Sequence, residues 1–229
     1  CRKENTREHV RYDIWLKSST WYEAAILIIL MSYSPIISEL IESLCCMPGI
    51  GRKSAQRIAF HLLERDKEGA QKLSQKLASA VKDIKHCERC RMFTDEDLCL
   101  ICRSSARNDG TLCVVESPAD VMAIEEATGF KGKYFILMGH LSPIDGIGPE
   151  DLGLNKLEFQ FKEEEITELI IATNSTVEGD ATAHYLSGLA AKYQIQCSRI
   201  AHGIPLGGEL EYVDGGTLSH AFFGRRRME

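Results

Sequence analysis

The sequence has no apolar run long enough to cross a membrane. The longest run extends from Ala24 to Met31, whereas a transmembrane helix needs about 20 apolar residues. Acidic residues are mixed with the basic ones before this run, and the preceding stretch is long for a secretory leader. We therefore expect neither a membrane-spanning segment nor a signal peptide.

The sequence also lacks the motif G-x-x-x-x-G-K-[ST], the glycine-rich loop that binds the phosphates of ATP. One stretch, Leu210 to Asp214, faintly resembles a Walker B strand, which accompanies that loop in ATPases. Without a phosphate-binding loop, this stretch cannot support ATP hydrolysis. We do not expect the protein to be an ATPase.

Disulfide bonds cannot pair all of the nine cysteines, because their number is odd. Four of them form two close pairs, and the others are scattered along the chain, mostly among apolar neighbours. This distribution fits a reducing compartment better than an oxidising one. We expect the protein to be cytoplasmic.

The two close pairs follow the pattern C-x2-C-x8-C-x2-C and comprise Cys87, Cys90, Cys99 and Cys102. Each pair can turn two sulfurs toward one ion, so the four thiolates can bind one tetrahedral Zn2+ per chain. Sulfur would then occupy every coordination position, which predicts a structural and not a catalytic zinc. Two disulfides or four unrelated thiols are the alternative, which the short paired spacing disfavours.

The net charge of −6 conceals an uneven distribution. Residues 52–91 contain 11 Lys and Arg against 5 Asp and Glu, whereas residues 92–229 contain 11 against 22. The phosphate backbone of a nucleic acid would be attracted to the first region and repelled by the second. We expect any DNA contact to lie before and around the cysteine pairs, although a solvated basic helix face would have the same composition.

Residues 31–86 have the pattern of helices separated by a tight turn. Apolar residues recur at helical spacing after Pro35, and again from Ala55 onward, on either side of the breaker Met-Pro-Gly-Ile-Gly at 47–51. In a helix-hairpin-helix, such glycines let backbone amides approach a phosphate at the start of the second helix. Lys53 and Arg57 lie on that helix, four residues apart, and are predicted to contact DNA phosphates. A plain structural turn is the alternative.

A further helical pattern covers residues 70–84, and beyond Cys102 short apolar runs alternate with helical patterns. We expect strands at 112–115, 134–138, 169–172 and 198–201, and helices at 119–127 and 181–193. This alternation predicts an α/β fold, with a parallel sheet covered by helices on both faces. Functional groups gather at the carboxyl ends of such strands, and Glu116, His140 and Asn174 occupy those positions.

The segment from Ile171 to Asp180 is similar to the A-T-D-x-D-x-E-G-E strand end of the Toprim domain of topoisomerases and primases. In that domain a strand-end glutamate, here Glu116, and two aspartates gather Mg2+ for phosphodiester chemistry. The two aspartate positions are Asn174 and Thr176 in this chain. Only Glu116, Glu178 and Asp180 remain, so we expect weak Mg2+ binding at most and no catalysis.

Six stretches together resemble the RecR family of bacterial recombination mediators over residues 31–225. They are P-G-I-G-R-K-S-A-Q-R, the four-cysteine pattern, E-S-P-A-D, L-M-G-H-L-S-P-I-D-G-I-G-P, A-T-N-S-T-V-E-G-D and R-I-A-H-G-I-P-L-G-G-E-L-E-Y-V-D. The resemblance implies a non-enzymatic DNA-repair protein that forms a ring-like homo-oligomer, a dimer or a tetramer. It also implies action with RecO and RecF to load the recombinase RecA onto gapped or single-stranded DNA.

The predicted organisation has five parts. Residues 1–30 are an extension without counterpart in that family, 31–86 the helix-hairpin-helix region, 87–102 the zinc finger, 110–205 the Toprim domain and 206–229 a C-terminal segment. Glu116, Glu178 and Asp180 are then expected to dock partner proteins, because carboxylates at a strand edge attract basic surfaces. The alternative is a Mg2+-dependent nuclease, primase or topoisomerase subunit, which would be expected to keep aspartate at positions 174 and 176.

Overall fold

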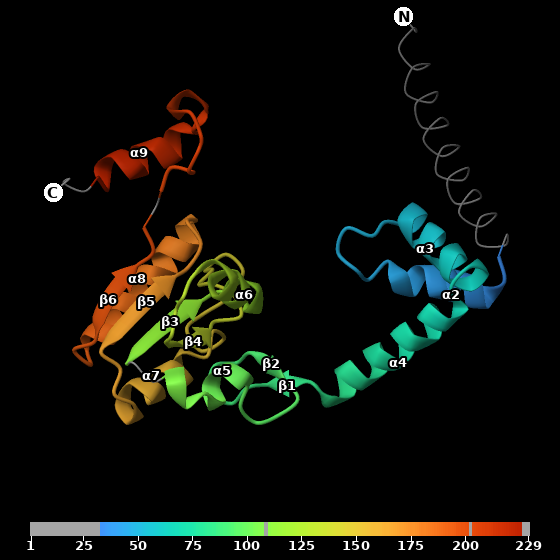
Figure 1. Ribbon diagram of the computed structural model, residues 1–229, viewed down its shortest axis with the longest axis horizontal. Coiled ribbons are helices and arrows are strands. Elements are labelled where there is room, and N and C mark those ends of the chain that lie inside the picture. The colour runs from blue at the N-terminus through green and yellow to red at the C-terminus, as the bar shows by residue number, and fades with distance from the viewer. Residues whose placement is uncertain (1–32, 108–109, 202, 226–229) are drawn as a thin grey trace, which may run out of the picture. The chain divides into compact units, whose positions relative to one another are not determined.

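A computed structural model describes residues 33–107, 110–201 and 203–225 (Figure 1). The predicted extension at residues 1–30 and the apolar run at 24–31 lie outside these residues. The chain divides into two compact units, with the boundary between Val81 and Lys82. Each unit is described by itself.

The first unit is helical, with α2 (Pro35–Leu44), α3 (Arg52–Glu64) and α4 (Lys67–Asp83). Pro35 occupies the first position of α2, as predicted, because its fixed φ suits a helix start and its missing N–H would have no partner there. Helices α2 and α3 pack around Ile41, Ala55 and Ala59, all fully buried. Alanine at two of these positions lets the helix backbones approach closely.

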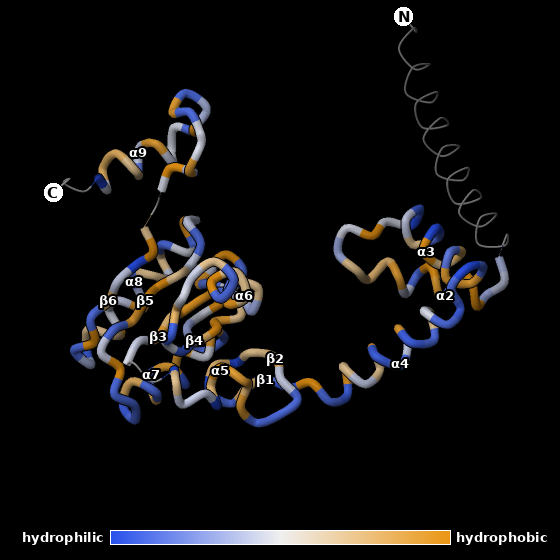
Figure 2. Tube along the Cα trace, in the orientation of Figure 1, coloured by the Kyte–Doolittle hydropathy of each residue, from blue (hydrophilic) through white to orange (hydrophobic). Residues whose placement is uncertain are grey.

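Helix α4 has an apolar face that nothing in the described part of a single chain buries. Leu73, Leu77 and Val81 are 55%, 61% and 78% exposed, and none of the residues of α4 is buried. Figure 2 shows apolar positions recurring along this helix between hydrophilic ones. The sequence correctly predicted the helix, but its apolar face is not part of a core within the chain.

The second unit begins with the zinc module, which we define as residues 84–104. It contains the short antiparallel pair β1 (Lys85–His86) and β2 (Phe93–Thr94), followed by α5 (Leu100–Arg103). A 3-10 turn at Ser105–Arg107 leads toward the first strand of the main sheet.

The main sheet has four parallel strands in the order β4-β3-β5-β6. They are β3 (Thr111–Val115), β4 (Lys133–Ile136), β5 (Glu168–Ala172) and β6 (Gln196–Arg199). The central strands are almost wholly apolar because both of their faces are buried. This confirms the predicted α/β class and the parallel sheet.

Alternate residues of each strand enter two separate cores. Val114 and Leu169 pack with α7 (Leu154–Glu163) and α8 (Val177–Ala191) on one face. Val115 and Ile136 pack with α6 (Pro118–Ala127) on the other, where the zinc module adds Met92 and Ile101. Figure 1 shows α6 and α8 on either side of the strands.

Three elements of the structure differ from the prediction. Helix α8 begins at Val177, four residues before the predicted start, because the Thr176 hydroxyl accepts a hydrogen bond from the Gly179 N–H at 3.0 Å and caps the helix. Strand β6 lies two residues earlier than predicted, and α7 was not predicted at all. Helix α7 follows Gly153, whose φ of 67° lies in the left-handed region that glycine favours.

The C-terminal segment contains a 3-10 turn at Leu210–Tyr212 and α9 (Gly215–Phe223). The comparison of Leu210 to Asp214 with a Walker B strand was therefore wrong, because no strand forms there. Asp214 instead caps α9 by accepting the Thr217 N–H at 2.9 Å, and this contact with Thr217 lowers the pKa of its carboxyl group. No helix among the described residues is both long and apolar enough to cross a membrane.

Candidate zinc centre and nucleic-acid interface

The four predicted zinc ligands come together in the zinc module. Their sulfur atoms all lie within 4.8 Å of one another, and all four side chains are buried: Cys87, Cys90, Cys99 and Cys102. Zn–S bonds of about 2.3 Å in a tetrahedron place sulfurs roughly 3.8 Å apart. The observed cluster therefore fits Zn2+ with little rearrangement.

Backbone donors point at two of these sulfurs. The Cys99 N–H donates to Cys87 Sγ at 3.3 Å, and the Met92 N–H donates to Cys90 Sγ at 3.4 Å. Hydrogen bonds to a charged ligand favour its ionised form, here the thiolate that zinc requires. The four cysteines hold one structural zinc ion, and four sulfurs leave no position for a water molecule.

The zinc module is joined to the sheet through a half-buried arginine. Arg91 has a φ of 70° and donates to the carbonyl oxygens of Leu137, at 2.9 Å, and Leu152. Burial lowers the pKa of its guanidinium group. The Ile136 N–H also donates to the Cys90 oxygen at 3.0 Å. Because Arg91 follows a zinc ligand directly, the metal fixes the loop that anchors the sheet.

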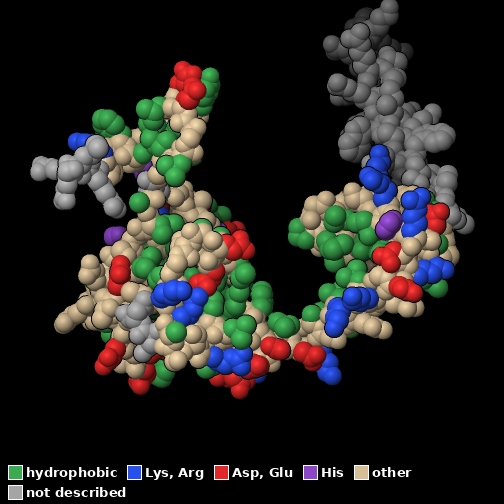
Figure 3. Space-filling model, in the orientation of Figure 1, with side chains coloured by type: hydrophobic (Ala, Val, Ile, Leu, Met, Phe, Trp, Pro, Cys, Tyr) green, Lys and Arg blue, Asp and Glu red, His purple; other side chains and the backbone are tan. Residues whose placement is uncertain are grey.

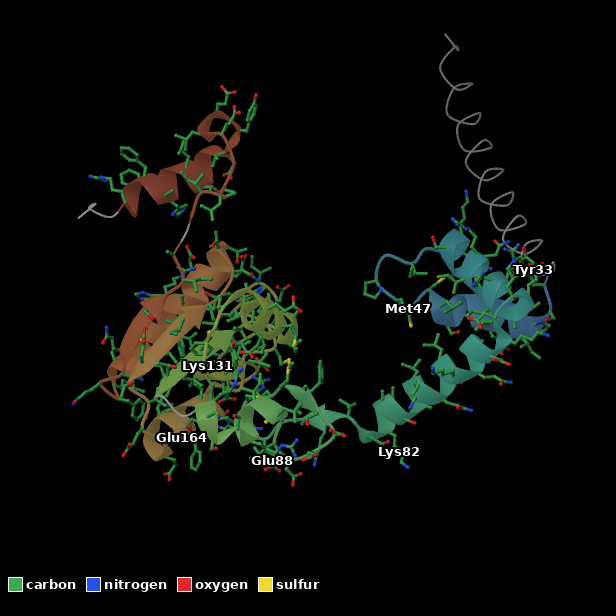
Figure 4. All side chains as sticks on the ribbon, viewed as in Figure 1. Tyr33, Met47, Lys82, Glu88, Lys131 and Glu164 are labelled. Atoms are coloured by element: carbon green, nitrogen blue, oxygen red, sulfur yellow. The ribbon has the colours of Figure 1, made fainter. Side chains whose placement is uncertain are left out.

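The helix-hairpin-helix of the first unit presents a helix start without a side-chain cap. The turn closes through the Ile50 N–H donating to the Met47 oxygen at 3.1 Å, and Gly49 has a φ of 78°. Met47 is labelled at this turn in Figure 4. Gly51 precedes α3, and no side chain in the described part of the protein caps the first N–H groups of that helix. These donors can bind an anion.

Three cations flank this helix start. Arg52, Lys53 and Arg57 are exposed, and none of them is in an ion pair of the described residues. Figure 3 shows Lys and Arg side chains gathered on the first unit. Of these residues, the sequence singled out Lys53 and Arg57, whose helix position the structure confirms.

At the carboxyl ends of β3 and β5, an amide occupies the place of a catalytic carboxylate. Glu116 is only 6% exposed. Its two carboxylate oxygens accept the Asn174 N–H at 2.8 Å and the Asn174 Nδ2–H at 2.7 Å. His140 Nδ1 lies 3.6 Å from Glu116 Oε2. The three strand-end residues predicted from sequence therefore lie close together, and two of them, Glu116 and Asn174, are joined by hydrogen bonds.

The other two carboxylates predicted from sequence, Asp180 and Glu178, do not contact Asn174 in this way. Asp180 is exposed and pairs with Arg199 of β6 at 2.5 Å, while Glu178 lies in the first turn of α8. Within the described residues, the four cysteines are the only group of three or more His, Cys, Asp or Glu side chains that lie close enough together to share a metal ion. Glu116, Glu178 and Asp180 are not gathered in that way.

Sequence reasoning missed Arg91 and Arg199, which hold the zinc module and the start of α8. Each contacts residues at least 19 positions away. No local pattern marks either residue, so only the folded arrangement identifies them.

Four family models match the chain in order. They are the RecR helix-hairpin-helix at residues 37–81, the RecR four-cysteine zinc finger domain at 84–104, the Toprim domain at 110–201 and the RecR C-terminal model at 203–226. Together with the geometry above, these matches define a zinc-containing Toprim protein of DNA repair and recombination.

The chain belongs to the RecR family. Membership supports a mediator role in recombination repair, and the helix-hairpin-helix and Toprim domains are consistent with DNA binding. It favours a non-catalytic function.

Proposed function

We propose that the protein binds DNA through its helix-hairpin-helix and acts in the cytoplasm with RecO and RecF to load RecA onto gapped or single-stranded DNA. The observation that carries the proposal is the uncapped start of α3 beside Lys53 and Arg57. Free backbone N–H groups and two exposed cations together suit the phosphate backbone, which is the same in every sequence. Binding is therefore independent of base sequence.

Charge distribution supports the same placement of DNA. The local excess of Lys and Arg lies at residues 52–91, and seven of its eleven cations belong to the first unit, whereas residues 92–229 are strongly acidic. When Lys and Arg side chains neutralise the phosphates of DNA, the counterions of those phosphates are released, and this release strengthens the binding of the protein. The second unit is thus left to contact proteins.

The strand-end geometry supports a role without phosphodiester chemistry. Two-metal catalysis needs several free carboxylates to balance the charge of its ions. Both oxygens of Glu116 already accept hydrogen bonds from Asn174, and the Thr176 hydroxyl caps α8. A Mg2+ ion would have to share these oxygens with the Asn174 donors and would gain no negative charge from Asn174 or Thr176.

The carboxylates that are more accessible suit a basic surface of a partner protein. Glu178 and Asp180 lie together in the first turn of α8, and Glu116 holds the neighbouring loop in place through Asn174. Complementary charge at such a patch would set the encounter rate and register with RecO or RecF.

Assembly into a ring-like dimer or tetramer is supported by apolar surfaces that one chain leaves open. Besides the face of α4, Phe222 and Phe223 of α9 are 65% and 79% exposed. Contiguous exposed apolar surface on a protein commonly marks an interface. A second copy of the chain is the occupant we propose.

The DNA proposal is tested with the double variant Lys53→Glu, Arg57→Glu, and with Lys131→Glu, Lys192→Glu as the matched control, since both of these lysines are exposed and lie in the acidic part of the chain. Fluorescence anisotropy with labelled DNA at several salt concentrations should show weaker binding and a smaller salt dependence for the first variant. Each lost phosphate contact reduces the slope of log K against log salt by about 1. Equal slopes for the unchanged protein and the first variant would place the DNA elsewhere.

The docking proposal is tested with the triple variant Glu116→Ala, Glu178→Ala, Asp180→Ala, using RecO association and DNA binding as separate measurements. Lost association with retained DNA binding is the expected result. The unchanged protein should not cleave or join DNA in Mg2+ or Mn2+. Metal-dependent cleavage that disappears in the triple variant would establish the catalytic alternative instead.

A further inference from the structure

A groove of about 470 Å3 lies between the zinc module and α7. Its walls include Glu88, Arg89 and Leu98 from the zinc module and Phe159, Gln160 and Glu163 from α7. Helix α7 ends at Glu163, shortly before β5 begins at Glu168. The groove therefore lies near the amino ends of the strands, at the opposite end of the sheet from Glu116.

Two residues that line the groove, Gln160 and Arg89, each have one buried polar atom without a hydrogen-bond partner among the described residues. Gln160 is 7% exposed, and its Nε2–H donates to the Arg89 oxygen at 2.7 Å, which leaves its Oε1 unpaired. Arg89 pairs with Glu164 through Nη2, but its Nε–H is unpaired. Buried polar groups without partners are rare and costly, and a bound molecule can supply the partners.

The unpaired atoms are one acceptor and one donor. A peptide unit carries one N–H and one C=O, so an extended peptide backbone can donate to Gln160 and accept from Arg89. A phosphate offers only acceptors and would leave Gln160 unpaired. The pair of atoms thus favours a peptide backbone over a phosphate group.

The groove also presents apolar surface. Phe159 is 62% exposed although it lies on a helix whose opposite face is fully buried. Leu98 lines the other wall. An exposed aromatic beside an aliphatic wall is the usual anchor for an apolar side chain of a partner.

The rim of the groove is acidic. Glu88 and Glu163 are exposed there, and Glu164 is already paired with Arg89. Figure 4 labels Glu88 in the zinc module and Glu164 beyond the end of α7. Lys156 is the one other cation among the lining residues. This balance attracts basic side chains and repels phosphates.

We propose that this groove binds an extended segment of a partner protein that carries an apolar side chain flanked by Lys or Arg. The peptide backbone pairs with Gln160 and Arg89, the apolar side chain packs on Phe159 and Leu98, and the basic side chains face Glu88 and Glu163. The zinc ion holds one wall of the groove in place. This site is separate from the DNA-binding hairpin and from the strand-end carboxylates.

The experiment selects a library of short random peptides on the zinc-loaded full chain. The most enriched peptide is then labelled and its affinity measured by fluorescence anisotropy. We expect an enriched pattern with one large apolar residue between basic ones, and affinity that falls as salt increases. Enrichment of acidic peptides, or of none, would overturn the proposal.

Two variants locate the bound peptide, and each has a matched control. Phe159→Asp should weaken binding at least tenfold, whereas Ile144→Asp, which replaces another exposed apolar residue outside the groove, should not. Glu163→Lys should likewise weaken binding, whereas Glu126→Lys on α6 should not. Equal binding by Phe159→Asp and the unchanged protein would refute this location.

Gln160→Leu tests the backbone pairing, with zinc content and thermal midpoint measured alongside. Should this variant not fold, Phe159→Asp still decides the proposal because its side chain is largely exposed. Lys53→Glu with Arg57→Glu should bind the peptide normally, so a failure of the DNA proposal and a failure of this one can be told apart. The proposal of a separate groove would be contradicted if the peptide competed with DNA for the protein and if its binding were lost in that double variant.

Discussion

Asn174 changes the chemistry of the strand end by replacing a negative charge with a hydrogen-bond donor. In a catalytic Toprim site, a cation holds neighbouring carboxylates together. Here the Asn174 side-chain amide and its backbone N–H both donate to Glu116, at 2.7 and 2.8 Å. The loop after β5 is therefore held without metal.

Asn174→Asp should destabilise the fold at neutral pH by about 1–3 kcal/mol, because Glu116 loses a donor and gains a like charge beside it. A divalent cation would relieve the repulsion. Thermal unfolding with and without Mg2+ should show a larger stabilisation of this variant than of the unchanged protein. An unaltered midpoint in the absence of Mg2+ would mean that the amide contact carries little energy.

Close packing between the start of α8 and the loop after β5 requires glycine at position 179. A Cβ atom at this position would lie 2.0 Å from the Asn174 oxygen and 3.2 Å from Glu116 Oε1. The first of these contacts is with backbone, which cannot rotate away. Glycine thus allows the start of α8 to approach the loop that holds Glu116.

Gly179→Ala should lower the free energy of unfolding by about 1–3 kcal/mol, because overpacking forces the backbone to shift. Gly188→Ala on the same helix is the control, since a Cβ there has nothing within 4 Å. It should raise stability by up to about 1 kcal/mol by reducing the freedom of the unfolded chain. Denaturant unfolding measures both, and similar effects of the two changes would contradict the packing argument.

The zinc module is too small to fold around an apolar core of its own. Its buried residues are mainly the four cysteines, with Met92, Leu98 and Ile101 packed against them. The metal therefore replaces the core, and Arg91 transmits the resulting shape to the sheet. The wall of the peptide groove that comes from the zinc module depends on this arrangement.

Cys90→Ser should abolish stoichiometric zinc binding and expose the module to proteolysis. Structural zinc contributes about 10–16 kcal/mol in small metal-folded peptides, so the short loops cannot fold without it. Elemental analysis and limited proteolysis measure these effects, with Cys45→Ser as the control because Cys45 is exposed and distant in sequence. Full zinc content in Cys90→Ser would remove Cys90 from the ligand set.

Helix α4 extends from the first unit into the boundary with the second, and its apolar face is open along its length. An apolar stripe at helical spacing normally packs against another element. No residue of α4 is buried by the described part of one chain. A second chain can bury this stripe.

Leu73→Lys with Leu77→Lys should reduce the molar mass in light scattering, because charged residues cannot pack in an apolar interface. Thermal stability of each chain should change little, since both leucines are more than half exposed. Lys72→Ala with Lys76→Ala on the polar side of α4 is the control. The same mass for all three proteins would place the interface elsewhere, for instance at α9.

Several features follow from the sequence because they depend on residues close together in the chain. The cysteine spacing predicted the zinc site, the turn at 47–51 predicted the hairpin, and the alternation after Cys102 predicted the parallel sheet. Helical spacing and turn residues act over a few positions, so a linear pattern contains the information. The absence of aspartate at positions 174 and 176 was likewise visible directly.

Other features were decided only by the tertiary structure. Asn174 meets Glu116 across 58 positions, and Gln160 meets Arg89 across 71. Strand register and the docking of the zinc module bring these residues together, and neither leaves a local pattern. The sequence by itself determined the modules and their order. Long-range packing decided which carboxylates accept hydrogen bonds from distant residues, which buried polar atoms lack a partner among the described residues, and which apolar helix faces remain exposed.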